Sequence, residues 1–288
     1  MKILRTIGEA QKLTTSLRLK NKTIGFVPTM GYLHDGHLSL VKAARKKADI
    51  VIVSIYVNPL QFAPTEDLSK YPRDFKRDEA LCRKAGVDYI FYPDDKQMYP
   101  EKYSTYVTVE NITNGLEGKI RPEHFKGVTT IVLKLFNIIQ PHFSVFGQKD
   151  AQQAAVIKKM TADLNVNTKI IVSPTVREAD GLAMSSRNVY LTKEQRADAP
   201  YLQKSLQYAK RKILLEGYNK DIEFLAGQMS KLIKSRKTAT KIDYISFNDY
   251  DTLEEVKSLK NSNNSAILIS LAVRFGKVRL IDNIVIKR

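Results

Sequence analysis

Two histidines stand three residues apart in a glycine-containing segment, Pro28–His37 (PTMGYLHDGH). At that spacing two side chains point the same way on a helix, so the rings of His34 and His37 can enter one cleft. The segment follows a short β-rich run, Thr23–Thr29, and leads into residues with helical periodicity. A helix N-terminus there offers unpaired N–H groups and a partial positive charge, which suit phosphate. The pattern predicts two donors to a phosphoryl group in transfer, with two surface histidines as the plainer alternative.

A neutral amide follows the next apolar run along the chain. Ile50–Val57 is almost continuously apolar and β-branched, as in a strand buried on both faces of a parallel sheet, and Asn58-Pro59 ends it. We expect Gln61 at the same sheet edge as the histidines, because open α/β sheets bind ligands at the carboxyl ends of their strands. An amide donates and accepts, which suits hydroxyl and carboxylate groups. A solvated loop glutamine is the open alternative.

A third segment, Phe146–Gln153 (FGQKDAQQ), again combines a strand end, a tight turn and a helix start. Gly147 permits the turn, Asp150 is placed to cap the helix, and Lys149 brings a cation to the carboxyl edge of the sheet. Gln153 lies one turn into the helix and is expected to face the cleft. A capped helix with an exposed lysine is the alternative.

A fourth segment, Ala179–Asn188 (ADGLAMSSRN), places two hydroxyls directly before an arginine. Ser185, Ser186 and Arg187 form a compact set of phosphate donors. The segment lies just past the domain boundary that we predict at about residue 175. It is therefore expected to close over a ligand held by the first domain, although such a loop is not specific by itself.

The elements that must position these residues alternate in type along the first part of the chain. Strands separated by helical stretches predict right-handed crossovers and a doubly wound parallel sheet. The expected strands are 23–29, 50–57, 87–92, 143–146 and 166–172, with helices at 38–48, 73–85, 128–139 and 151–161.

The pattern changes after about residue 175. Two helical stripes, beginning at Leu202 and Ile222, precede strands expected at 242–247, 266–273 and 277–286. Helices followed by clustered strands suggest a small α+β domain. We predict an α/β protein with a doubly wound first domain, residues 1–175, and a smaller α+β domain, residues 176–288.

Composition excludes several classes of protein. The 288 residues are 43% hydrophobic and 27% charged, unlike a disordered chain, a collagen-like repeat or a disulfide miniprotein. The single cysteine, Cys82, cannot form an intramolecular disulfide, so a reducing cytoplasm is expected. We see no targeting segment, and the longest apolar run is far shorter than the ~20 residues of a membrane helix. A soluble protein with no membrane partner is predicted.

The net charge of +17 is the unusual bulk property. The excess is spread over both halves, whereas nucleic-acid binders more often concentrate it in a stripe or arm. Its clusters, Arg45–Lys47, Lys210–Lys212 and Lys231–Lys241, lie on or beside helical patterns, where a solvated face is the simplest reading. We predict no nucleic-acid partner, but such a charge attracts a polyphosphate such as ATP.

Together these segments resemble the pantothenate synthetase family, the pantoate–β-alanine ligases. The resemblance covers nearly the whole chain. HxGH alone would indicate only the wider nucleotidylyl-transferase superfamily, whereas the complete set in this order is highly specific. The similar segments are PTMGYLHDGHLSLV from Pro28, VSIYVNPLQF from Val53, Tyr71-Pro72-Arg73, RPEHFKG from Arg121, FGQKDAQQ from Phe146, READGLAMSSRNVYL from Arg177 and SLAVRFGKVRLIDN from Ser270.

The resemblance implies an ATP-dependent ligation with Mg²⁺, a Rossmann-like first domain and a homodimer. The family joins pantoate to β-alanine and releases AMP and pyrophosphate. A carboxylate is a poor electrophile toward an amine, so pantoate is first converted to pantoyl adenylate, an anhydride with a good leaving group. Small-molecule substrates are therefore the expected partners.

The resemblance also assigns site residues. His37 is the proton donor, with His34 and Lys149 as further catalytic groups, and Gln61 and Gln153 bind pantoate. Gln61 also binds β-alanine, and Asp78 matches an acidic position that we assign to Mg²⁺. The implied ATP-binding residues are Met30, Gly31, Tyr32, Leu33, His34, Asp35, Gly36, His37, Gly147, Gln148, Lys149, Asp150, Val176, Met184, Ser185, Ser186 and Arg187.

Three positions depart from the family pattern, and two other functions remain open. Tyr32, Ala63 and Gln148 stand where a small residue, a glycine and a glutamate are common. An adenylyltransferase of the same superfamily would release pyrophosphate without β-alanine-dependent AMP release. A non-catalytic RNA-binding protein would show a salt-dependent gel shift without ATP turnover.

Overall fold

The computed structural model describes residues 1–63, 66, 68–218, 221–260 and 266–287. The chain folds into two compact units. The first unit comprises Met1–Gln148 and Val156–Pro174, and the second comprises Lys149–Ala155 and Thr175–Arg288. The boundary expected at about residue 175 leaves Lys149–Ala155 in the first domain. Within the second unit, Nδ2 of Asn283 in the last strand donates a hydrogen bond to the Lys149 carbonyl of this segment.

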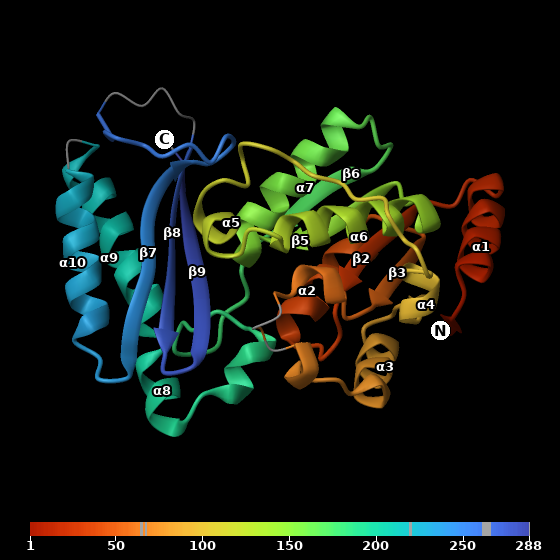
Figure 1. Ribbon diagram of the computed structural model, residues 1–288, viewed down its shortest axis with the longest axis horizontal. Helices are drawn as coiled ribbons and strands as arrows, with labels where there is room; N and C mark the ends of the chain where they lie inside the picture. Colours follow the sequence, from red (N-terminus) through yellow and green to blue (C-terminus); the bar gives the residue numbers. More distant parts are fainter. Residues whose placement is uncertain (64–65, 67, 219–220, 261–265, 288) are drawn as a thin grey trace. The chain divides into compact units, whose positions relative to one another are not determined.

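A six-stranded parallel sheet forms the centre of the first unit, in the order β1-β4-β3-β2-β5-β6 (Figure 1). The alternation of strands and helices predicted this architecture, and the α/β doubly wound fold is confirmed. The strands are β1 (Lys2–Leu4), β2 (Ile24–Thr29), β3 (Ile50–Ile55), β4 (Tyr89–Phe91), β5 (Phe143–Gly147) and β6 (Lys169–Ser173).

Helices pack on both faces of this sheet because neighbouring strand residues point in opposite directions. In β2, Val27 joins a core cluster with Val41 and Ala44 of α2, whereas the Phe26 ring packs edge-on against Phe136 of α6. The helices are α1 (Ile7–Leu19), α2 (Asp35–Arg45), α3 (Phe75–Lys84), α4 (Asp95–Met98), α5 (Leu116–Ile120), α6 (His124–Ile139) and α7 (Ala151–Asp163), with short 3₁₀ turns η1 (Pro59–Gln61), η2 (Leu68–Lys70) and η3 (Gln148–Asp150).

The strand order reverses between β2 and β5. The strands after β2 continue to one side as β3 and β4, whereas β5 pairs with the opposite edge of β2. The carboxyl end of the sheet at such a reversal of strand order is the usual ligand site of open α/β sheets.

The second unit packs helices α9 and α10 along one face of an antiparallel sheet, β7-β8-β9 (Figure 1). Its middle strand is almost entirely buried. The small α+β arrangement predicted for this region is observed. The elements are η4 (Ser186–Tyr190), α8 (Lys193–Asp198), α9 (Tyr201–Glu216), α10 (Ile222–Lys234), β7 (Ala239–Asp249), β8 (Ala266–Phe275) and β9 (Val278–Lys287).

Across the part of the chain that the structure describes, we find no helix with both the length and the apolar character needed to cross a membrane.

Candidate functional site

The two histidines cap the N-terminus of α2 and cap each other's backbone. Nδ1 of His34 accepts a hydrogen bond from the Gly36 N–H at 3.1 Å, and Nδ1 of His37 accepts one from the His34 N–H at 3.3 Å. Their ring centroids lie 4.1 Å apart, so the structure brings the pair together as predicted. A ring nitrogen that accepts an N–H carries no proton, so each neutral ring bears its proton on Nε2. The pair therefore offers two Nε2–H donors at the start of a helix.

The loop that carries these histidines is held by a buried carboxylate. Oδ2 of Asp78 accepts the Tyr32 N–H and Oδ1 accepts the Leu33 N–H, each at 2.7 Å. Gly31 and Tyr32 have φ values of 84° and 50°, and a Cβ on Gly31 would lie 3.0 Å from Oδ2 of Asp78. The turn is thus left-handed, glycine-dependent and fixed from α3.

Asp78 is the one metal ligand that the sequence suggested, and in this structure both of its oxygens accept backbone hydrogen bonds. The side chain is 1% exposed, and both oxygens face backbone N–H groups. Burial raises the pKa of this carboxyl, although the two backbone hydrogen bonds and Arg77 act to lower it. No group of three or more His, Cys, Asp or Glu side chains within the described ranges has a metal-binding arrangement. We therefore assign Asp78 to positioning the loop, and its assignment to Mg²⁺ stays a prediction.

The amide of Gln61 has a fixed orientation. The Tyr99 hydroxyl donates to Oδ1 of Asn58 at 2.7 Å, so Nδ2 of Asn58 must be its donor side. That nitrogen donates to the Gly127 carbonyl at 3.0 Å and to Oε1 of Gln61 at 3.2 Å. Nε2 of Gln61 consequently points away from Asn58 and lies 2.9 Å from the Met30 sulfur. The loops after β2 and β3 thus meet, and Gln61 presents N–H groups there.

The main chain of Gln61 is held by a second set of residues. Nη2 of Arg121 donates to the Gln61 carbonyl at 3.1 Å, and Nδ1 of His124 lies 2.9 Å from the same oxygen. Since a carbonyl can only accept, Nδ1 of His124 carries the proton, and its Nε2 accepts from Nη1 of Arg121 at 3.3 Å. Burial and the nearby Arg121 lower the pKa of His124 to about 4, which keeps the ring neutral. Glu66 binds Arg121 through two contacts of 2.5 and 2.7 Å.

A glycine lets α6 approach this turn directly. A Cβ on Gly127 would lie 2.3 Å from the Leu60 carbonyl oxygen and 2.6 Å from the Gln61 nitrogen. Only glycine fits such an approach without displacing η1. Arg121, His124 and Gly127 belong to the RPEHFKG segment, which carries part of the family resemblance but received no task from the sequence.

The remaining predicted residues lie in the second unit, apart from Gly147 and Gln148, which end the first stretch of the first unit. Nζ of Lys149 lies 3.3 Å from Oδ1 of Asp150, so Asp150 pairs with the lysine that was predicted to meet phosphate. Gln153 lies in the first turn of α7 and is half-buried.

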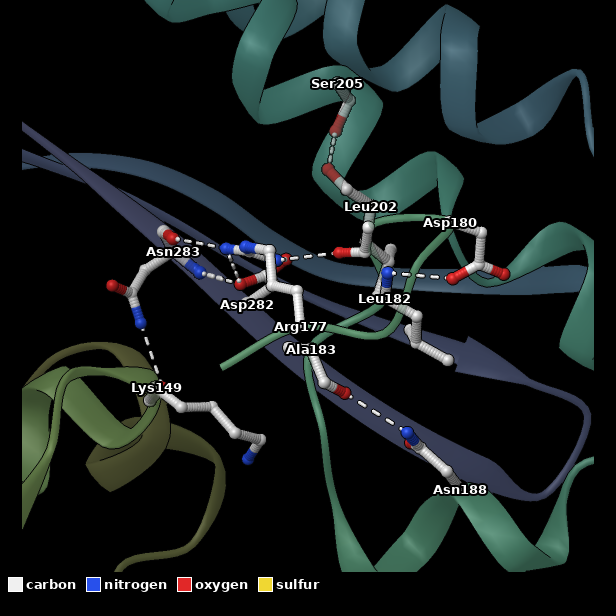
Figure 2. A network of polar contacts seen from close by, with 11 residues as sticks. Lys149, Arg177, Asp180, Leu182, Ala183, Asn188, Leu202, Ser205, Asp282 and Asn283 are labelled. Carbon is white, nitrogen blue, oxygen red and sulfur yellow. Dashed lines mark hydrogen bonds and ion pairs between the residues drawn. The ribbon is translucent and has the colours of Figure 1, made fainter. Parts of the chain in front are cut away.

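The serine–arginine loop of the second unit is held by hydrogen bonds of its own backbone and side chains. The Met184 N–H donates to the Val176 carbonyl at 3.0 Å, which joins two of the predicted ATP positions. Oγ of Ser185 accepts the Arg187 N–H at 3.2 Å and caps η4. Nδ2 of Asn188 donates to the Ala183 carbonyl at 3.1 Å (Figure 2). Hydrogen bonds therefore fix both the beginning of the loop, at Met184, and its end, at Asn188.

Comparison with known proteins gives one consistent result. The sequence model of the Pantoate-beta-alanine ligase family matches residues 2–285. The pantothenate synthetase of Caldicellulosiruptor bescii is 52% identical over 287 residues, which cover 100% of this chain and 99% of that protein. The pantothenate synthetase of Acetivibrio thermocellus is 50% identical, with 100% of both chains covered.

Two solved structures show the same fold. The crystal structure of pantothenate synthetase from Thermus thermophilus has a TM-score of 0.90 and 40% identity, with 99% of each chain covered. Pantoate-beta-alanine ligase from Francisella tularensis, complexed with beta-gamma ATP and beta-alanine, has a TM-score of 0.78 and 38% identity, covering 99% of this chain and 97% of that one.

Proposed function

The chain belongs to the pantoate–beta-alanine ligase family, and from that premise we propose how its residues carry out the ATP-dependent joining of pantoate to β-alanine. One observation carries the proposal. His34 and His37 cap each other at the N-terminus of α2, each with its proton on Nε2, and the amide of Gln61 lies beside the same loop. The relative from Francisella tularensis, whose structure holds beta-gamma ATP and beta-alanine, supports these substrates.

The first step forms pantoyl adenylate. A carboxylate oxygen of pantoate attacks the α-phosphorus of ATP, the bond from that phosphorus to the bridging oxygen breaks, and pyrophosphate leaves with the bonding electrons. Negative charge gathers on the phosphate oxygens during this step, and donors fixed in advance stabilise it. We assign this task to the Nε2–H groups of His34 and His37, with Lys149 as the cation.

The second step forms the amide bond. The neutral amine of β-alanine attacks the acyl carbon, the bond from that carbon to the phosphate oxygen breaks, and AMP leaves while the amine proton passes to solvent. The adenylate must survive until the amine arrives, so water has to be kept out. We assign pantoate to Gln61 and Gln153 and β-alanine to Gln61.

The ATP ligands that we propose are those of the family resemblance. The geometry supports the first group, because Asp78 fixes the backbone of Tyr32 and Leu33 beside the α2 N-terminus. In the second unit, the bond from Met184 to Val176 supports the assignment of both residues to one set. The proposed ligands are Met30–His37, Gly147–Asp150, Val176 and Met184–Arg187.

Mg²⁺, a homodimer and the cytoplasm remain predictions from the resemblance. The chemistry assigned to the residues above routes no step through Mg²⁺. Gel filtration at two protein concentrations tests the dimer.

Omitting one substrate at a time tests the function. With ATP, pantoate and β-alanine all present, we expect AMP and pyrophosphate in equal amounts. Without β-alanine, pyrophosphate release should stop after about one turnover per site, because the adenylate stays bound. Continued pyrophosphate release without β-alanine would instead indicate an adenylyltransferase, and RNA binding without ATP turnover would indicate a binding protein.

A further inference from the structure

Two neighbouring residues of β9, Asp282 and Asn283, touch both parts of the second unit to which we assign phosphate binding. They are 2% and 5% exposed. We propose that Asp282 and Asn283 are positioning residues that hold Lys149 and the loop Met184–Arg187 in one fixed arrangement. This inference rests on the proposed function, because it gives the pair a task only if Lys149 and the loop bind the phosphates of ATP.

Asn283 acts on Lys149 through its backbone. Nδ2 of Asn283 donates to the Lys149 carbonyl at 2.9 Å (Figure 2). The bonded carbonyl belongs to the middle residue of η3, just before α7, and the bond fixes the backbone from which the lysine side chain extends. The backbone at Lys149 sets where the lysine stem begins, so displacing it would change the distance over which the ammonium group must reach the phosphates.

Asp282 acts on the loop through Arg177. The carboxylate accepts from Nη1 and Nη2 of Arg177 at 2.7 and 2.9 Å, a bidentate pair, and Oδ1 also accepts the Asn283 N–H at 2.8 Å. Nη1 of Arg177 in turn donates to the Gly181 carbonyl at 3.1 Å, which closes the hairpin that leads into Met184. Figure 2 shows the guanidinium between that hairpin and β9.

Asp282 and Asn283 lie on a regular strand, β9. The register between β8 and β9 runs unbroken from Ala266 opposite Lys287 to Phe275 opposite Val278. Adjacent strand residues point to opposite faces, so Asp282 and Asn283 can serve two segments at once. Functional side chains are held most precisely when regular elements support them. The segment to which the pair belongs, SLAVRFGKVRLIDN, carries part of the family resemblance and received no task from the sequence.

A double-mutant cycle tests the arm that runs to Lys149. We measure pyrophosphate release in a single turnover, and ATP affinity separately, for Asn283→Ala, Lys149→Ala and the double variant. Losing one hydrogen bond should slow release about tenfold when Lys149 is present. In the Lys149→Ala background the same change should alter the rate by about twofold or less, because the lysine is then absent. An equal loss in both backgrounds would overturn the proposal.

Asp282→Asn tests the other arm. It keeps the size of the side chain but gives Arg177 only one oxygen in place of two. The hydrogen bonds of Asp282 run through Arg177 to the loop, and only its charge reaches Lys149, so most of the slower release should persist in the Lys149→Ala background. A loss that vanished with the lysine would contradict the separate task that we give Asp282.

Ser270→Ala is the matched control. Ser270 lies opposite Asn283 on β8, is 6% exposed, and its Oγ has no hydrogen-bond partner among the described residues. This change should leave release within about twofold, and thermal unfolding checks all variants for folding. Asn283→Ser, whose hydroxyl is too short for the Lys149 carbonyl, replaces the alanine variant if that variant unfolds. Failure of the wild-type chain to release pyrophosphate would refute the proposed function, whereas an active chain without coupling refutes only this inference.

Discussion

Two loops that we assign to ATP are each held by a buried aspartate, and the two aspartates work in different ways. Asp78 accepts two consecutive backbone N–H groups, those of Tyr32 and Leu33. Asp282 accepts hydrogen bonds from the guanidinium of Arg177, which also donates to the Gly181 carbonyl in the hairpin that begins at Arg177. The first clamp acts on the main chain directly and needs no particular side chain in the loop. The second depends on one arginine.

The difference matches what each loop has to position. The loop after β2 carries His34 and His37. Their ring nitrogens accept backbone N–H groups, which requires one backbone conformation, and the contacts of Asp78 with the main chain stabilise that conformation. The hairpin from Arg177 leads to hydroxyls and an arginine, which can adjust their own rotamers. We infer that loss of the Asp78 contact would be felt mainly in the chemistry, whereas loss of the Arg177–Asp282 pair would lower the stability of the second unit as well as slow the chemistry.

Loss of the second histidine should have the largest effect. His37→Ala removes one fixed donor to a developing charge, worth ~2.7–4 kcal/mol, or roughly 10²–10³ in the rate of adenylate formation. Ser186→Ala in the other loop removes one neutral hydrogen bond, net ~0.5–1.5 kcal/mol, and should slow the step far less. Single-turnover pyrophosphate release measures both. Similar losses in the two variants would break the comparison.

The second clamp should reveal itself in stability. Arg177→Ala leaves the carboxylate of Asp282, 1% exposed, without its cation, and breaking a buried pair in this way costs about 3–5 kcal/mol. Arg177→Lys keeps the charge and should cost less. Lys159→Ala is the control, since it breaks an ion pair with Asp163 whose side chains are 55% and 48% exposed and should cost at most about 1 kcal/mol. Urea unfolding gives the three values, and a loss for Arg177→Ala no larger than the control would contradict the assignment.

The hydrogen bond from His124 to the Gln61 carbonyl tests whether fixing a residue's backbone also fixes its side chain. His124→Leu removes the ring N–H from the Gln61 carbonyl, and we expect KM for pantoate to rise about tenfold with little change in ATP affinity. His124→Asn places an amide N–H near the same oxygen and should recover part of the loss. Val132→Ala, a buried change in the same helix, should lower stability and leave KM unchanged. Equal weakening of ATP and pantoate would show that His124 supports the fold alone.

Periodicity predicted most of the fold, because buried strands and helix stripes are local patterns. Val51, Val53 and Val145 lie in the cores of strands that the apolar runs had located. The helix at Ile7–Leu19 was missed, although its capping box, Thr6 with Glu9, is visible in the sequence as T-x-x-E. The three-residue strand before it is too short to give a pattern.

The sequence predicted which residue types come together at the candidate site, but not the residues that hold them in place. His34 and His37 meet because their spacing is local, and Gln61 lies by Met30 because parallel strands end together. Asp78 could not be connected with Leu33 from sequence, since they are far apart in the chain and every residue except proline offers an N–H. The metal role suggested for it stays a prediction.

The smallest effect, and the sharpest test of the two aspartates, is their pH dependence. Burial raises the pKa of the Asp78 and Asp282 carboxyls, although the hydrogen bonds that each carboxyl accepts act to lower it. An aspartate with a raised pKa in the fold binds its proton more readily there than in the unfolded chain. Its contribution to stability is therefore greatest in acid and falls as pH rises from about 4, the value of a free carboxyl, through the raised pKa.

Asp78→Asn removes this titration, so the free energy of unfolding lost in the variant should shrink as pH rises from about 4 to 7, by about 1.4 kcal/mol for each unit of the pKa shift. Asp282→Asn should show the same sign but a larger loss at neutral pH. It deprives Arg177 of a full charge at 2.7 Å, whereas Nη1 of Arg77 lies 3.8 Å from Asp78, beyond hydrogen-bond distance. Urea unfolding of both variants and the wild-type chain at several pH values gives the two curves. If the free energy of unfolding lost in Asp78→Asn grew with pH, the Asp78 carboxylate would be stabilised by more than two backbone N–H groups. That result would contradict the difference that we draw between the contacts of Asp78 with the main chain and the ion pair of Asp282.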